Sequence, residues 1–152
     1  MGKLQVLRQS SPTQLMCYVE VVLLLGVARF ALLFISFQRL LRLFGLRAEK
    51  RQWQPETVSG PRAAEIRVVA RAIRRCARHV PWQAKCLVQA LTGRAMLARR
   101  GLTPCIWFGV LKEPDQAMEA HAWLVCDQQF VTGGEESGRF VPMTCFVPRD
   151  AR

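Results

Sequence analysis

The chain has 152 residues, of which 51% are hydrophobic, and this suits one compact domain with its own core and an extra helix. Twenty-two basic against 11 acidic residues give a net charge of +11, which favours a polyanion, an anionic membrane or an acidic peptide as partner; a merely solvated basic face fits equally well. The six cysteines follow no secretory signal pattern, which argues against an exported disulfide-rich mini-protein. We therefore expect reduced cysteines and a cytoplasmic location.

The first predicted element is an apolar helix over residues 15–45. Glu20 and Arg29 interrupt it, and no charge-free piece reaches the roughly 18 residues that a membrane-spanning helix needs. Arg29 would lie near the middle of the bilayer, at a cost of at least about 2.5 kcal/mol. A helix that is buried or docked on a partner is favoured over a span, and so is a helix on a membrane surface, because QRLLRLFGLR places arginines beside leucines. Gly45 is expected to end the helix.

The polar stretch at 47–61 contains two prolines and a glycine, and it is predicted to be a linker. It would separate an N-terminal helical segment, 1–46, from a domain at 62–152. That domain is predicted to begin with helices over 62–79 and 84–99. The first alternates an apolar stripe with an arginine face, and the second ends in cations followed by a glycine.

Strands are predicted after these helices. Three short apolar runs, 105–111, 120–126 and 130–133, are separated by the turn residues EPDQ and DQQ. Two or three antiparallel strands that follow helices indicate an α+β domain.

Cys86 lies where the helix over 84–99 should begin. A helix N-terminus carries roughly half a positive charge and unpaired backbone amides, so it can stabilise a thiolate and an oxyanion. Lys85 adds positive charge. The position therefore suits the nucleophile of an acyl-transfer reaction.

Two histidines are available as a base. His79 lies near the end of the preceding predicted helix, whereas His121 lies on the predicted strand AHAWLVC, on the same face as Trp123 and Val125. A single histidine often has only a structural role. A cysteine at a helix start that faces a histidine on a strand is, however, the geometry of papain-like and transglutaminase-like enzymes.

Four motifs follow one another in this part of the chain: VPWQAKCLVQALTGRAMLARRGL, WFGV, AHAWLV and VTGGEE. With the apolar helix that ends in FQRLLRLFG, they resemble the lasso-peptide biosynthesis leader peptidase, a transglutaminase-like cysteine peptidase. The resemblance covers most of the chain and is strongest over 76–134. It implies a peptidase without a cofactor that cleaves the leader from a ribosomally synthesised precursor peptide, with Cys86 as nucleophile and His121 as base.

The resemblance also implies partners. An apolar N-terminal helix leaves no room for a leader-binding domain, so we expect a separate leader-recognition protein. An ATP-dependent cyclase would then close the macrolactam ring. Contact of residues 15–45 with a membrane stays an alternative to a purely cytoplasmic protein.

The third catalytic group is open at this stage. The family is described with a Cys-His-Asp set, and Asp127 matches its acidic position after HAW. A straight strand would, however, place Asp127 roughly 20 Å from His121. A hairpin through DQQ would instead bring residues near 133–134 beside His121, so that Glu135, Glu136 or a backbone carbonyl could orient the imidazole.

Two residues before the nucleophile complete the predicted site. Gln83 could donate to the oxyanion, as side-chain amides do in other cysteine peptidases, or it could face solvent at the helix end. Trp82 is interpreted as packing around the site, together with Trp123, rather than as touching substrate.

Three other functions fit parts of the sequence. Cys76, His79 and Cys86 have a metal-like order, but there is no second tight pair, so no metal is expected. The charge and the arginine-rich helix suit nucleic acid, yet no recognised motif or stacking array accompanies them, and none is expected to bind. Amide transfer in place of hydrolysis would use the same fold.

Overall fold

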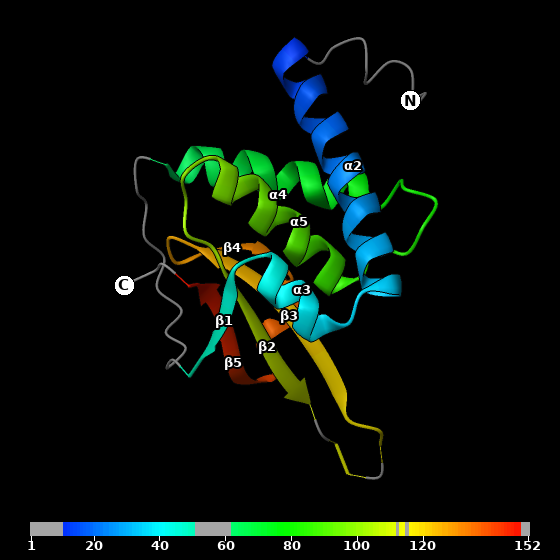
Figure 1. The fold of residues 1–152 in the computed structure, drawn as a ribbon, viewed down its shortest axis with the longest axis vertical. Helices are drawn as coiled ribbons and strands as arrows, with labels where there is room; N and C mark the ends of the chain where they lie inside the picture. Colours follow the sequence, from blue (N-terminus) through cyan, green and yellow to red (C-terminus); the bar gives the residue numbers. More distant parts are fainter. Residues whose placement is uncertain (1–10, 51–61, 112, 115, 150–152) are drawn as a thin grey trace.

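A computed structural model describes residues 11–50, 62–111, 113–114 and 116–149 of the chain (Figure 1). Within these residues, five helices and five strands follow in the order α2, α3, β1, α4, α5, β2, β3, β4, α6 and β5. The strands form one antiparallel sheet. The long helices α2, α4 and α5 pack in layers beside this sheet. The fold is therefore α+β, as predicted.

The N-terminal helix α2 (Pro12–Phe34) begins at a complete capping box. The Ser11 hydroxyl accepts a hydrogen bond from the Gln14 amide at 3.3 Å, and the Gln14 side chain accepts one from the Ser11 amide at 3.3 Å. Pro12 stands at the first helical position, where its missing N–H costs nothing. The start of this helix is thus fixed by local sequence.

The single helix predicted over 15–45 is in fact two helices. Extended backbone at Ile35 and Ser36 separates α2 from α3 (Phe37–Leu43). Gly45 follows with a left-handed backbone, φ 60°, so the predicted stop is confirmed.

The helices α4 (Ala63–Ala77) and α5 (Cys86–Arg99) confirm those predicted over 62–79 and 84–99. α4 buries one stripe and exposes its arginines, as its period predicts. α5 is enclosed on several sides, because it lies between the other helices and the sheet. Its buried residues are Val88, Ala90, Leu91, Thr92, Gly93, Arg94, Met96 and Leu97.

The sheet has the strand order β1–β5–β2–β3–β4. Three strands confirm the predicted runs, and two are additional. The bounds are β1 Leu46–Glu49, β2 Cys105–Leu111, β3 Glu119–Cys126, β4 Gln129–Thr132 and β5 Val141–Pro148. A two-residue turn joins β3 to β4, and both of its residues, Asp127 and Gln128, have positive φ.

The predicted linker at 47–61 is wrong over its first residues. β1 pairs with β5 from Leu46 opposite Pro148 to Glu49 opposite Cys145, so this stretch is an edge strand of the main sheet. Residues 51–61 lie outside the described residues. The last residue of the predicted N-terminal segment, Leu46, and the first three of the predicted linker therefore pair with β5 in the main sheet.

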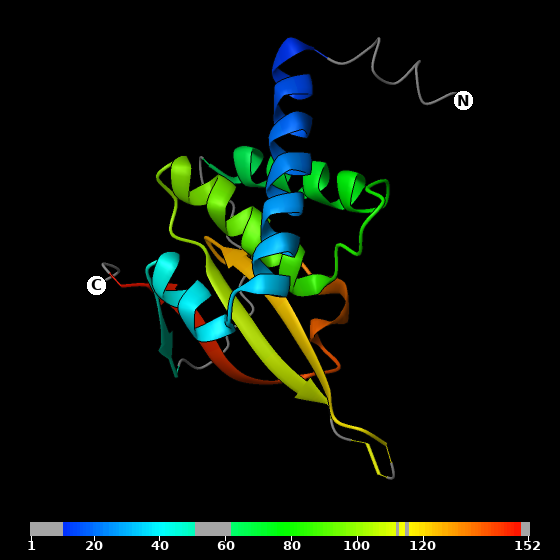
Figure 2. The same cartoon turned by 45° about the vertical axis from the view of Figure 1, so that its right-hand side comes forward.

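The elements stack in three layers (Figures 1 and 2). α2 packs on α4 and α5, and these two helices pack on the sheet. The main core lies between helices and sheet and includes Ile73, Leu91 and Leu124. A second cluster contains Trp107 and Trp123, which alternate with main-core residues along their strands and so lie on the other face of the sheet.

Candidate active site

Cys86 is the first residue of α5. Lys85 precedes it with an extended backbone (φ −66°, ψ 173°) and makes no side-chain cap, and the first turn of α5 contains no acidic residue. The amides of the first helical residues have no partner within a helix, and they point out of its N-terminal end. The Cys86 side chain is half-exposed and lies at the N-terminal end of α5. Several N–H groups and the positive end of the helix dipole favour an anion there.

His121 lies on β3 and is 93% buried, with a relative exposure of 7%. Its Nε2 atom is 2.8 Å from the carbonyl oxygen of Gly133. Because a carbonyl only accepts, Nε2 must carry the proton in this hydrogen bond. The neutral imidazole is thereby held as the tautomer with a free lone pair on Nδ1, which is the form that a general base needs.

Aromatic rings fix the plane of the His121 imidazole. The Trp123 ring lies 5.9 Å from it and the Phe140 ring 4.9 Å, with interplanar angles of 25° and 30°. Trp123 is fully buried and packs against the histidine, as predicted. The imidazole thus packs against two aromatic rings and bonds a carbonyl through Nε2.

The carbonyl of Gly133 reaches His121 because β4 ends early. β4 pairs with only the last residues of β3, from Leu124 to Cys126, and the chain then turns beside the earlier part of β3. Gly133 makes this turn with φ 71°. A Cβ atom there would lie 2.7 Å from the Ala122 carbonyl oxygen and 3.1 Å from His121 Nε2, so no larger residue fits.

Cys86 and His121 line the same open pocket, which has a volume of about 780 Å³. The structure therefore brings together the two residues that the sequence predicts as nucleophile and base. The pocket lies at the N-terminal end of α5, with α4 on one side and β3, β4 and α6 (Gly134–Ser137) on the other. Its charged lining residues are Arg74, Arg78, Lys85, Glu119, Glu135 and Glu136.

The structure does not bring Asp127 to the imidazole. Asp127 is exposed in the β3–β4 turn, at the opposite end of β3 from His121, and it is not among the residues that line the pocket. The acidic position of the motif predicts Asp127 as the third catalytic residue, whereas the geometry of β3 separates Asp127 from His121. Glu135 does line the pocket, but its carboxylate pairs with Arg74 at 3.7 Å. The hydrogen bond to the imidazole that the structure contains comes from the backbone alternative, the carbonyl of Gly133.

The two residues predicted before the nucleophile lie outside the pocket lining. Gln83 is exposed, and Trp82 packs against α2, where its ring would be 3.4 Å from a Cβ atom on Gly26. The amide that does line the pocket is Gln89, one turn into α5, which donates to the Ala84 carbonyl at 2.7 Å. Sequence analysis missed Gln89, and only its spacing of three residues from Cys86 could have indicated it.

The second histidine belongs elsewhere. His79 is exposed after α4, and its Nδ1 atom bonds the Arg75 carbonyl at 2.8 Å. Cys76 is buried, and burial raises the pKa of its thiol. Among the described residues, no group of three or more His, Cys, Asp or Glu side chains is arranged to hold a metal ion.

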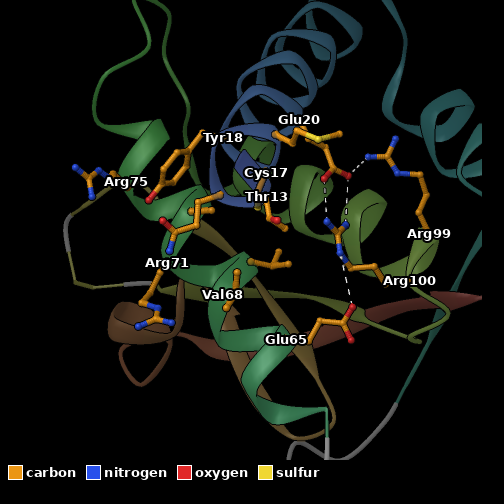
Figure 3. Close-up of a pocket in the computed structure, with 14 residues that line it drawn as sticks. Thr13, Cys17, Tyr18, Glu20, Glu65, Val68, Arg71, Arg75, Arg99 and Arg100 are labelled. Carbon is orange, nitrogen blue, oxygen red and sulfur yellow. Dashed lines mark hydrogen bonds and ion pairs between the residues drawn. The ribbon is translucent and has the colours of Figure 1, made fainter. Parts of the chain in front are cut away.

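A second, larger pocket of about 890 Å³ lies between α2 and α4 (Figure 3). Its carboxylates face arginines: Glu20 bonds Arg99 and Arg100, with 2.9 Å to Arg100, and Glu65 lies 3.8 Å from Arg100. It contains neither histidine, and burial raises the pKa of the thiol that it holds, Cys17. The described lining of this pocket thus contains no cysteine–histidine pair, and the pocket of Cys86 and His121 is the better candidate for the active site.

A thiol at a helix N-terminus, the backbone amides of that helix end and a histidine with a fixed tautomer together supply what acyl transfer through a thioester requires. Comparison with known proteins agrees with this chemistry. A family model described as the transglutaminase-like superfamily matches residues 31–145, more than half of the chain, and this membership indicates a cysteine-dependent hydrolase or transferase. No curated protein and no solved structure gives a significant match. The chain belongs to the transglutaminase-like superfamily.

Proposed function

We propose that this protein is a cysteine peptidase that removes the leader from a lasso-peptide precursor. One observation carries the chemistry: Cys86 at the start of α5 and His121, with its Nε2 proton given to Gly133, line one pocket. The choice of a peptide substrate rests on the resemblance of the four sequence motifs to the leader peptidases. The size of the pocket and its opening to solvent suit an extended peptide.

The proposed reaction begins with proton transfer from the Cys86 thiol to Nδ1 of His121. The thiolate attacks the carbonyl carbon at the junction of leader and core, and the amides at the start of α5 stabilise the oxyanion. Nδ1 then donates its proton to the leaving nitrogen, which becomes the new amino terminus of the core peptide. A thioester between leader and Cys86 remains.

Water resolves the thioester in the second half of the reaction. His121 takes a proton from the water as it attacks, and Cys86 leaves as a thiol after it regains that proton. The leader is released as a carboxylic acid. An amine in place of water would give an amide, which is the transferase outcome that the superfamily also contains.

Two partners belong to this proposal. A separate leader-recognition protein would bring the precursor to the pocket, and an ATP-dependent cyclase would use the new amino terminus. Both come from the family resemblance, and the basic surface, with a net charge of +11, suits an acidic partner segment. The location proposed for this assembly is the cytoplasm.

The test is mass spectrometry of a precursor peptide that is incubated with the protein and a leader-recognition partner. Wild type should release a leader with a free carboxylate. Cys86→Ala and His121→Ala should each lower release by at least about 10³-fold. His79→Ala is the matched control, because His79 is exposed and lies outside the pocket, and it should match wild type.

Equal release by wild type and Cys86→Ala would remove Cys86 from the mechanism. A leader that carries an added amine would establish transfer in place of hydrolysis. Protein that binds polynucleotide with a steep salt dependence and cleaves no precursor would favour the nucleic-acid alternative.

A further inference from the structure

The outer face of α2 is an unbroken apolar stripe. Six large side chains recur at intervals of three or four residues and so line one side of the helix, and each is between 53% and 74% exposed: Met16, Val19, Leu23, Val27, Phe30 and Phe34. Leu43 on α3 is exposed as well. A monomeric soluble protein rarely exposes a continuous apolar surface of this length.

The opposite face of the same helix belongs to the core. Val21, Leu25 and Ala28 are buried against α4 and α5, which lie between α2 and the sheet. α2 therefore lies along the domain with one face packed and one face open. Its N-terminal half also projects beyond α4 and α5 (Figures 1 and 2).

The charges of α2 lie beside the stripe and not on it. Glu20 is held by Arg99, the last residue of α5, and by Arg100, which directly follows α5, so its carboxylate is neutralised within the protein (Figure 3). Arg29 is half-buried. The stripe itself presents no charge over the length of the helix.

Basic residues flank the stripe in the sequence and on the surface. Arg39 and Arg42 are exposed on α3, directly after α2, and Lys3 and Arg8 precede α2 in the sequence. Glu20 is the one acidic residue among positions 1–48. Apolar side chains followed by exposed cations on α3, with further cations before them in the sequence, complement an anionic lipid surface, in which acyl chains receive the apolar groups and headgroups receive the cations.

We propose that α2 lies flat on an anionic membrane, with its stripe inserted at the boundary of headgroups and acyl chains. The membrane would then lie against α2, on the side of the molecule that is away from the sheet. The lining of the Cys86 and His121 pocket includes no residue of α2, so a membrane against the outer face of α2 leaves this pocket open to solvent. The protein would act on its peptide at the membrane surface.

A flat helix explains more of the structure than a spanning one. α2 is long and apolar enough to cross a bilayer, but a span would pull Val21, Leu25 and Ala28 out of the core and place Arg29 among acyl chains. A helix on the surface keeps the packed face in the domain and buries only the exposed one.

Vesicle flotation tests this proposal on the full-length protein. Wild type should float with vesicles of phosphatidylcholine mixed with phosphatidylglycerol, and less with phosphatidylcholine alone. The double variant Leu23→Glu, Phe30→Glu should lower the partition coefficient at least about tenfold, because two inserted side chains become charged. Arg39→Gln with Arg42→Gln should remove most of the preference for the anionic lipid.

The matched control is the double variant Val68→Glu, Val141→Glu. It also replaces two exposed apolar residues with carboxylates, but on α4 and β5, and it should float like wild type. The proposal is overturned if wild type floats with neither vesicle, or if the α2 variant floats as wild type does. Retention on the membrane through an alkaline carbonate wash would overturn the flat arrangement in favour of a span. If the wild type does not float but forms a stable dimer, and the α2 variant abolishes that dimer, the stripe would be assigned to contact with a second copy of the chain.

Discussion

The imidazole of His121 is oriented by a backbone atom. Only a residue without a side chain can place its carbonyl at that point, because Gly133 has φ 71° and its missing Cβ would crowd both His121 and the Ala122 carbonyl. The orientation of the His121 imidazole in the candidate site thus depends on a glycine.

Gly133→Ala should therefore displace the carbonyl or the imidazole. We expect a fall in kcat of at least about tenfold, with a loss of about 1–3 kcal/mol in the free energy of unfolding from the strained backbone. Gly138→Ala is the control, since Gly138 has φ −64° and open space around it, and it should change neither quantity. Steady-state kinetics and urea unfolding measure both. Unchanged kcat in Gly133→Ala would show that the carbonyl is dispensable.

Asp127 offers the complementary prediction. It lies in the turn at the far end of β3, where Asn tolerates the observed φ of 46° as well as Asp does. Asp127→Asn should keep kcat within about threefold of wild type. An aspartate that orients a catalytic histidine costs about 10⁴ in kcat when it becomes asparagine, so the two outcomes are far apart. A large loss would mean that the turn moves to the site during the reaction.

At the scale of elements, one ion-pair network fastens α2 to α5. Glu20 accepts from Arg100 at 2.9 and 3.3 Å and also from Arg99. The hydrogen bond from Arg100 lowers the pKa of the Glu20 carboxyl below its usual 4.5, against the opposing effect of burial. A lowered pKa in the folded state means that this contribution to stability is present above pH 4.5 and disappears as the pH falls through the folded pKa.

Glu20→Gln should lower the free energy of unfolding by about 1 kcal/mol at pH 7. The difference from wild type should vanish in acid, where the wild-type carboxyl is protonated too. Chemical denaturation across the pH range measures it, with Glu113→Gln at an exposed site as the control. A difference that persists in acid would assign the effect to packing and not to charge.

The elements that the sequence predicts are those with a local signal. The amphipathic period of α4, the turn residues between β3 and β4, and the glycine after α3 are each signals that span only a few residues. β1 and β5 have no such local signal, because β1 is a short edge strand with two charged residues and β5 contains Pro142 and Pro148. Prolines normally argue against a strand, but Pro142 stands next to a register shift and Pro148 at the strand end, where a missing N–H is tolerated.

The same distinction holds for the active site. That Cys86 begins a helix and His121 lies on a strand of the same pocket could be predicted, because a helix start and a strand are local features with recognisable residue types. The orienting group could not be fixed, because a carbonyl carries no sequence signature and its position depends on where β4 ends. A motif alone predicts Asp127 as the third catalytic residue. The length of β3 separates Asp127 from His121, whose hydrogen-bond partner is the Gly133 carbonyl.

At the scale of the whole molecule, the two faces of α2 have different roles. Its inner face completes the core of a domain whose family match begins only at residue 31, inside this helix. Its outer face carries the stripe, whose six side chains are each more than half exposed. If both statements hold, substitutions on the two faces must affect different properties.

Leu25→Ala and Leu23→Ala make that comparison with the same chemical change on one helix. Leu25 is fully buried, so its truncation should lower the free energy of unfolding by about 2–5 kcal/mol, whereas Leu23 is 63% exposed and its truncation should stay within about 0.5 kcal/mol. Urea unfolding followed by tryptophan fluorescence, which reports Trp107 and Trp123 in the sheet as well as Trp82 beside α2, and by far-ultraviolet circular dichroism, which reports the helices, should give coincident transitions for both variants. Two separate transitions, or a neutral Leu25→Ala, would mean that α2 is an appendage and that the core closes without it.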